Sequence, residues 1–200
     1  RTLLNQFLKD YPKVQIELEL TSRRVDLMHD DIDLAIRTNF QANEDSSFIV
    51  RDVIKTTHCL VASPELLKGR HIQHFTELHE FPSVVLGMQK SQYYWHLNNR
   101  EHGEVIDIPL QPRIKSNDLA GVYYAVCDGF GIADLPYLAV EQDIKQGKLI
   151  HVLPEWCSNL GTVQLVYASR KGQRLVMEKL IDYLVEGLRD LAKDHLGYAL

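Results

Sequence analysis

Segments with a strand pattern alternate with amphipathic helical segments along this chain, and this alternation constrains its fold more than any other feature. Residues 3–11 place their apolar side chains on one helical face, and Pro12 ends the predicted helix. Residues 14–20 then alternate apolar and polar side chains, as a half-buried strand does. A short helix over 24–29 and a buried strand over 32–36 are predicted next. This succession indicates an α/β fold with a parallel sheet covered by helices.

The alternation continues to the end of the chain and provides enough elements for two lobes. One or two strands are predicted over 48–63, and further strands over 83–86, 93–97, 104–108, 113–115, 131–133, 148–153 and 162–169. A short helix is predicted to start at Pro64, and further helices are predicted over 75–80, 117–128, 136–146 and 173–193. The long strands near 59–62 and 163–166 are candidates for connecting the lobes. We therefore expect lobe I to comprise 1–60 and 168–200, lobe II to comprise 61–167, and a hinged cleft to separate them.

Composition excludes several classes of protein. The 200 residues are 45% hydrophobic and 24% charged, with a formal net charge of −5, so neither a disordered chain nor a basic nucleic-acid clamp is expected. No apolar run is long enough to span a membrane, and no signal peptide opens the chain. Cys59, Cys127 and Cys157 form no CxxC pair, which favours the reducing cytoplasm over a disulfide framework or zinc site.

Sequence signatures of catalysis and of cofactor binding are missing. No phosphate-binding loop, HExxH, GxSxG or EF-hand motif occurs. Gly129 and Gly131 resemble part of a dinucleotide fingerprint, but here they follow a helix and enter a strand, the reverse of that motif. His71 and His74 have a spacing that suits a metal, yet no further ligand completes a shell. We therefore expect no catalytic residues, no cofactor and no metal.

Two features favour ligand or signal binding. Ser116 and Asn117 begin a helix whose free N–H groups attract anions, and the predicted lobes place them opposite the strand ends at 21–22 and 38–39. Cys127 stands in the last turn of that helix beside Asp128, which would raise its pKa and reduce its reactivity. Two interpretations of Cys127 stay open: a small buried apolar residue, or a redox switch near the ligand floor of the second lobe.

The ordered set of motifs resembles the regulatory domain of LysR-type transcriptional regulators. The resemblance runs from Phe7 to about Leu188 and rests on these segments in order: FLxxYPxVxIEL (7–18), VDLxxDDIDLAIR (25–37), LVASPxLL (60–67), SND (116–118), GxGIAxLP (129–136) and GxLxxVLPxW (147–156). Within the family, the order of motifs is closest to the CrgA-like group and less close to AphB.

The resemblance implies a type 2 periplasmic-binding-protein fold of two Rossmann-like lobes with a small-molecule effector between them. It also implies antiparallel pairing into a homodimer or homotetramer through 3–11 and 117–128, with possible contact to RNA polymerase. DNA is contacted only through a winged helix-turn-helix upstream of this chain. Carried over to this sequence, the effector-binding residues are Thr21, Ser22, Arg37, Thr38, Asn39, Gly87, Ser116, Asn117 and Asp134, with a floor near 132–134.

The sequence departs from the family pattern in three respects. The family's first strand, with the loop after it, and the DNA-binding module are missing, so we expect this chain to be a fragment. Thr38 replaces a small residue. Asp134 puts an acid where the family is apolar, which disfavours a carboxylate effector unless Arg37 or another cation offsets it.

Two other functions stay open at this point. A periplasmic solute-binding protein shares the same fold, and residues encoded upstream of Arg1 would distinguish the two. A small α/β enzyme would need a nucleophile and base that the sequence does not display.

Overall fold

The chain folds into two compact units. The computed structural model describes residues 2–21, 23, 25–39, 48–88, 93–168 and 175–193. Unit 1 comprises Arg1–Lys55 and Gly161–Leu200, and unit 2 comprises Thr56–Leu160. Two long strands, β2 (Phe48–Ala62) and β9 (Trp156–Ala168), contribute to both units. The division therefore falls a few residues before the positions 60 and 168 that the sequence suggested.

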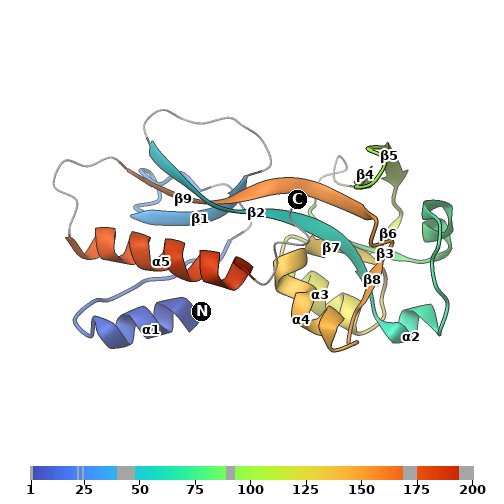
Figure 1. The fold of residues 1–200 in the computed structure, drawn as a ribbon, viewed down its shortest axis with the longest axis horizontal. Coiled ribbons are helices and arrows are strands. Elements are labelled where there is room, and N and C mark those ends of the chain that lie inside the picture. Colours follow the sequence, from blue (N-terminus) through green and yellow to red (C-terminus); the bar gives the residue numbers. More distant parts are fainter. Residues whose placement is uncertain are drawn as a thin grey trace. The chain divides into compact units, whose positions relative to one another are not determined.

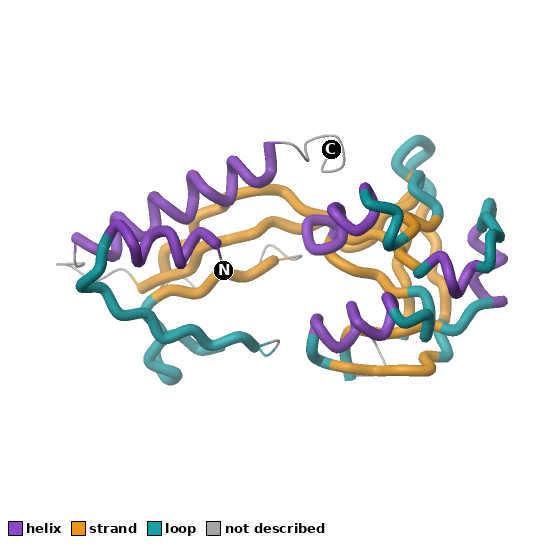
Figure 2. The backbone as a smooth tube through the Cα atoms, turned by 90° about the horizontal axis from the view of Figure 1, so that it is seen from below, coloured by secondary structure: helices purple, strands orange, loops and turns teal. Residues whose placement is uncertain are grey.

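Unit 1 is a sheet with two helices on one face. Strand β1 (Leu34–Asn39) pairs antiparallel with β9, which neighbours β2. Helices α5 (Leu175–Lys193) and α1 (Thr2–Asp10) lie one behind the other on the same side of these strands (Figures 1 and 2). The buried core of the unit consists of Val53, Leu165, Tyr167, Ile181, Leu184 and Val185.

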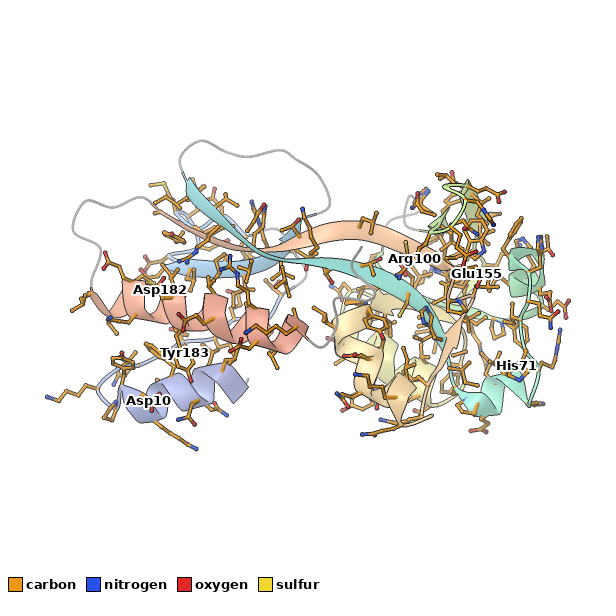
Figure 3. The ribbon with its side chains drawn as sticks, in the orientation of Figure 1. Asp10, His71, Arg100, Glu155, Asp182 and Tyr183 are labelled. Carbon is orange, nitrogen blue, oxygen red and sulfur yellow. The ribbon has the colours of Figure 1, made fainter. Side chains whose placement is uncertain are left out.

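Aromatic contacts hold α1 against α5. Phe7 is fully buried; its ring stacks on that of Tyr11 at 4.5 Å and meets that of Tyr183 edge-on at 5.5 Å. Figure 3 shows Tyr183 on the side of α5 that faces α1. This packing explains the apolar face that the sequence predicts for residues 3–11, because that face covers the neighbouring helix.

Three expectations for unit 1 are wrong. Residues 14–20 have no regular secondary structure and belong to no ladder, since an alternating pattern does not identify a pairing partner. The described residues in 24–31 form turns and no helix. The Asp26 carboxylate accepts from the Met28 and His29 N–H groups as at a helix start, but Asp31 has φ +54°, which ends the turn. The strand at 34–39 is antiparallel to its neighbour, and Ile36 on it is 49% exposed.

Unit 2 combines one parallel strand pair with antiparallel strands. Strands β3 (Ser83–Leu86) and β6 (Pro112–Ser116) are parallel. Strands β7 (Ala133–Pro136) and β8 (Ile150–Val152) pair antiparallel with β2, and β4 (Tyr94–Asn99) pairs antiparallel with β5 (Val105–Pro109) and β9. The helices are α2 (Pro64–Leu67), the 3-10 helix η1 (Phe75–Glu80), α3 (Leu119–Cys127) and α4 (Tyr137–Lys145).

The two faces of β2 bury different cores in unit 2. Cys59 and Val61 face α3 and α4, whereas Leu60 and Ala62 face the cluster around Trp95 and other large apolar residues. Residues 48–62 form one continuous strand, where the sequence left one or two open. The last strand starts at Trp156, well before the predicted 162. In the described part of the chain, no helix is long and apolar enough to cross a membrane.

Candidate functional site

Gly87, Ser116 and Asn117 come together at the carboxyl ends of the parallel strands β3 and β6. Leu86 pairs with Ser116, and the Gly87 N–H donates to the Ser116 carbonyl oxygen at 2.7 Å. Gly87 is buried and has φ +137°, a backbone conformation that favours glycine over any residue with a Cβ. Ligands of open α/β sheets favour such strand ends. The sequence-predicted residues of unit 2 therefore include one compact group with an exposed amide at Asn117.

The amides at the start of α3 are already taken by the chain itself. Asp118 is the N-cap, and its carboxylate accepts from the N–H groups of Ala120 and Gly121 at 3.3 and 2.9 Å. The Ser116 hydroxyl oxygen accepts from the Asp118 N–H at 3.0 Å. An anion at this helix start would thus compete with a built-in carboxylate, so the hydroxyl and amide of 116–117 are the more accessible groups.

Asp134 belongs to a buried hydrogen-bonded pair. It lies within the β2–β7 ladder opposite Leu60, and its Oδ2 is 3.2 Å from Nδ1 of His58. The two side chains are only 12% and 11% exposed. Together with burial, which is the larger cause, the charge of Asp134 raises the pKa of the Cys59 thiol above its ordinary value. The sequence analysis did not identify His58, because nothing local marks its cross-strand partner.

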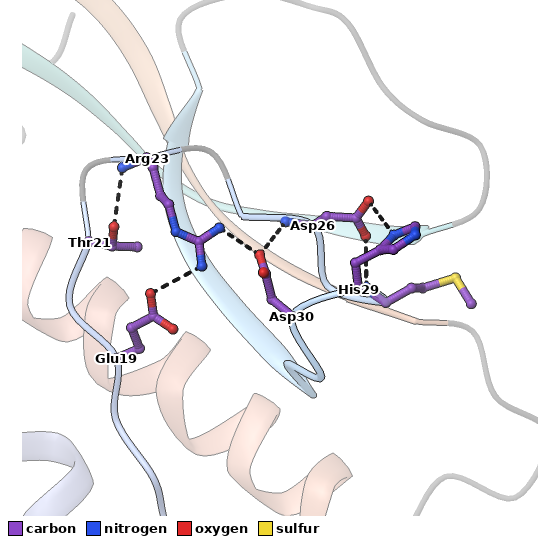
Figure 4. A network of polar contacts seen from close by, with 7 residues as sticks. Glu19, Thr21, Arg23, Asp26, His29 and Asp30 are labelled. Atoms are coloured by element: carbon purple, nitrogen blue, oxygen red, sulfur yellow. Dashed lines mark hydrogen bonds and ion pairs between the residues drawn. The ribbon is translucent and has the colours of Figure 1, made fainter.

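Thr21 of unit 1 lies at the edge of a polar network that closes its loop (Figure 4). Its hydroxyl oxygen accepts from the Arg23 N–H at 3.3 Å. The Arg23 guanidinium donates to Asp30 at 2.7 Å and to Glu19 at 3.4 Å. The hydrogen bond from Arg23 is the main cause that lowers the pKa of Asp30. Ser22, the other predicted residue of this loop, lies outside the described residues.

Arg37 and Thr38 follow each other on β1 and point to opposite faces of the sheet. Arg37 pairs with Gln164 of β9, and Thr38, which is exposed, pairs with Val163. Gln164 is only 5% exposed. The Arg37 Nε atom is buried and has no hydrogen-bond partner in the part of the chain that the structure describes. For Asn39 the structure describes the backbone only, opposite Thr162. Gln164 and Lys55, which donates to Thr162 of the same strand, are additions to the predicted site, because sequence patterns do not reveal cross-strand neighbours.

Cys127 lies next to a hydrogen-bonded cluster of polar side chains. Its thiol is within hydrogen-bonding reach of the Tyr123 hydroxyl. That hydroxyl donates to Asp143 at 2.8 Å and accepts from Lys148 Nζ at 2.7 Å. The hydrogen bond from Lys148 acts to lower the pKa of Tyr123, but burial and the Asp143 carboxylate outweigh it, so the pKa is raised. Among the three cysteines, Cys59 and Cys157 are buried and Cys127 is half-buried.

His74, one of the two histidines considered as metal ligands, has other contacts. His74 is the N-cap of η1, and Nδ1 of its ring accepts from the Thr76 N–H at 3.4 Å. Within the described residues, no three His, Cys, Asp or Glu side chains are grouped as metal ligands. The polar groups that remain for a ligand are hydroxyl, amide and guanidinium groups, which suit a small polar molecule.

The chain has two α/β units that share two long strands, and small polar residues lie at strand ends. These features define a two-unit α/β ligand-binding domain. Residues 1–189 match the model of the LysR substrate-binding domain. The chain therefore belongs to this family, and its fold is of the type 2 periplasmic-binding-protein kind.

Individual relatives agree with this assignment. The chain is 27% identical over 192 residues to PtxR of Pseudomonas aeruginosa and 29% identical over 195 residues to DmlR of Escherichia coli, both named HTH-type transcriptional regulators. These matches cover 96% and 94% of this chain, but only 58% and 61% of the relatives' length. The resemblance to LysR-type regulators is thus confirmed, and the chain spans about three fifths of these regulators.

Solved structures show the same fold. The regulatory domain of CrgA from Neisseria meningitidis superposes with a TM-score of 0.81 at 26% identity, covering 94% of this chain and 90% of that domain. Full-length AphB of Vibrio cholerae is described as a virulence activator of the LTTR family. It superposes with a TM-score of 0.78 at 27% identity, covering 93% of this chain and 62% of AphB. These matches confirm the expected fold and the likeness to both groups.

Proposed function

We propose that this chain is the effector-sensing part of a bacterial LysR-type transcriptional regulator whose DNA-binding module lies outside it. The family match over 1–189 carries this proposal, and the regulator names of the relatives favour it over a periplasmic receptor or an enzyme. The full protein works in the cytoplasm as a homodimer or homotetramer, contacts DNA through its other domain and contacts RNA polymerase. It catalyses no reaction: the effector binds one conformational state better than another and so shifts their populations.

The effector contacts the groups gathered at strand ends. In unit 2 these are the Ser116 hydroxyl and the Asn117 amide beside the glycine backbone of residue 87. In unit 1 they are the loop at Thr21 and the exposed hydroxyl of Thr38. Hydroxyl and amide groups both donate and accept, which suits a small polar molecule with groups of either kind.

The test uses the full-length regulator and DNA from upstream of its own gene. Fluorescence anisotropy measures DNA binding with and without each compound of a small-metabolite panel. We expect at least one compound to change the DNA affinity, and Ser116→Ala or Thr38→Val to weaken the response at least fivefold. Gln142→Ala, an exposed substitution on α4, serves as the matched control and leaves the response unchanged. A regulator that binds DNA identically with every compound contradicts the proposal.

A second candidate function is peroxide sensing at Cys127, which its half-buried position beside Tyr123 supports. Solved relatives include an AphB regulatory domain treated with cumene hydroperoxide and its C227S variant, both from Vibrio vulnificus. In this chain the Cys127 sulfur would attack the hydroperoxide, breaking the O–O bond. Cys127 becomes a sulfenic acid, and the leaving oxygen takes the thiol proton to form an alcohol.

The test of this second function compares the DNA affinity of the full-length regulator before and after cumene hydroperoxide. We expect treatment to change the affinity, reductant to restore it, and Cys127→Ser to abolish the response, while Cys157→Ser keeps it because Cys157 is buried. A Cys127→Ser variant that still responds would rule the switch out.

A further inference from the structure

One face of the unit 1 sheet carries a row of polar side chains. Leu165 and Tyr167 pack into the core beneath α5, so the alternate residues Thr162 and Gln164 of β9 point to the opposite face. Arg37 of β1 lies directly across from Gln164 in the antiparallel register. Every member of the row is in unit 1: Arg37, Asp52, Lys55, Thr162 and Gln164.

Two atoms of this row are buried and lack a hydrogen-bond partner among the described residues. One is Nε of Arg37, a donor, and the other is Oε1 of Gln164, an acceptor. The Gln164 amide nitrogen donates to Asp52 Oδ1 at 2.8 Å, which fixes the orientation of the amide and leaves its oxygen unpaired. Buried polar atoms nearly always have a partner, because leaving one unpaired destabilises the fold. A donor and an acceptor unpaired on neighbouring strands therefore indicate a ligand with complementary groups.

The charges of the row favour an anion. Lys55 Nζ donates to the Thr162 hydroxyl oxygen at 2.9 Å. Among the residues that the structure describes, neither Lys55 nor Arg37 forms an ion pair with a carboxylate. Asp52 is the acid in the row, and it is exposed and bound to the amide nitrogen of Gln164. The two cations thus outnumber the acid, while Asp134 of unit 2 is paired with His58.

We propose that this row binds the carboxylate and the hydroxyl group of a small hydroxycarboxylate. The carboxylate accepts from Arg37 Nε and faces the ammonium of Lys55, and the hydroxyl donates to Oε1 of Gln164. An amino acid fits less well, because its ammonium group would be repelled by both cations. The site is separate from the strand-end groups of the proposed function, because Arg37 and Thr38 point to opposite faces of β1, so it takes a second ligand of the regulator.

The test measures ligand binding to the full-length regulator by isothermal titration calorimetry, with lactate, propanoate and lactamide as probes. Lactate carries both groups, propanoate lacks the hydroxyl and lactamide lacks the charge. We expect lactate to bind at least tenfold more tightly than propanoate, because propanoate leaves the buried Gln164 oxygen unpaired. We expect lactamide to show no binding, because it is uncharged and is not attracted by the two cations. Equal binding of lactate and propanoate, or no binding of lactate, would overturn the proposal.

Variants assign the effect to the two unpaired atoms. Gln164→Leu makes the affinities for lactate and propanoate about equal, and Arg37→Met abolishes the binding of both compounds. Arg51→Met is the matched control, because Arg51 is on the same sheet but pairs with Asp182 at 2.8 Å. Without ligand, Gln164→Leu raises the melting temperature, since it removes the unpaired acceptor. A Gln164→Leu variant that keeps the tenfold preference contradicts the site.

The outcomes separate this inference from the proposed function. If lactate fails to bind but another compound of the panel changes the DNA affinity, the hydroxycarboxylate site is wrong and effector sensing stands. If lactate binds with the expected preferences but DNA affinity never changes, the site is correct and the proposed function is wrong.

Discussion

Gly131 approaches Pro82 so closely that a Cβ atom at residue 131 would lie 2.7 Å from the Pro82 carbonyl oxygen. The same carbonyl accepts from the Ile132 N–H at 2.9 Å, and the Val84 N–H donates to the Ile132 carbonyl at 2.8 Å. These bonds join the start of β3 to the chain that enters β7. The glycine therefore allows the two backbones to bond side by side.

We expect Gly131→Ala to destabilise the protein by about 2 kcal/mol or more, because the clash is with backbone atoms that cannot rotate away. Urea unfolding followed by circular dichroism measures the change. Gly147→Ala is the control: Gly147 has φ +70° and open space around it, so only backbone strain of about 1 kcal/mol is expected. Equal effects of the two substitutions would refute the role of the close contact.

Asp31 has φ +54°, in the left-handed region that residues other than glycine enter at a cost. Asp31→Gly should therefore raise the free energy of unfolding by about 0.5–1 kcal/mol. Asp33 lies two residues further on and has no positive φ. Asp33→Gly should therefore lower the free energy of unfolding, because glycine at this position only adds freedom to the unfolded chain. A loss of stability in Asp31→Gly, measured by urea unfolding, would contradict this explanation.

His151 makes the stability of the folded protein depend on pH. Burial lowers its pKa to about 4, and the positive charge of Arg100 adds to this. Because the folded state holds the proton less tightly than the unfolded chain, stability is highest above pH 6.5 and is lost as the pH falls towards 4. Allowing for the partial exposure of the ring, we expect a loss of about 2 kcal/mol from this residue. Urea unfolding of the wild type and His151→Gln at pH 7 and pH 4.5 measures it, and identical pH profiles would show the assignment to be incorrect.

The cluster around Tyr123 links α3, α4 and the chain before β8 through one hydroxyl. Tyr123→Phe should cost about 1 kcal/mol, because the half-buried Asp143 carboxylate loses a donor. A double-mutant cycle with Lys148→Met should give a favourable coupling energy between the two residues. Strict additivity of the two substitutions would mean that the 2.7 Å contact contributes nothing to stability.

Much of the fold could be predicted because its signals are local. The strand at 83–86 coincides with β3, and the apolar stripe after residue 173 is α5. Asp118 caps α3 within two residues of the expected start. Each of these depends on side chains within a few residues of one another, and periodicity and capping report such short-range preferences directly.

The residues of the candidate site also differ in whether the sequence could predict their neighbours. The family resemblance implied both Gly87 and Ser116 as site residues, and the parallel pairing of β3 with β6 brings them together at one edge of the sheet. Other partners could not be predicted from the sequence, because they come from strands that are distant in the chain. These are Gln164, the partner of Arg37, and His58, the partner of Asp134.

The sequence by itself determined the family, the order of helices and strands, and the glycines on which close backbone contacts depend. Only the tertiary structure decided that β1 runs antiparallel to β9, that residues 14–20 lack a ladder, and which buried polar atoms remain unpaired. The physical reason is range: a helix or an extended segment is stabilised by neighbours in the chain, whereas a ladder or a buried hydrogen bond depends on residues that folding brings from far away.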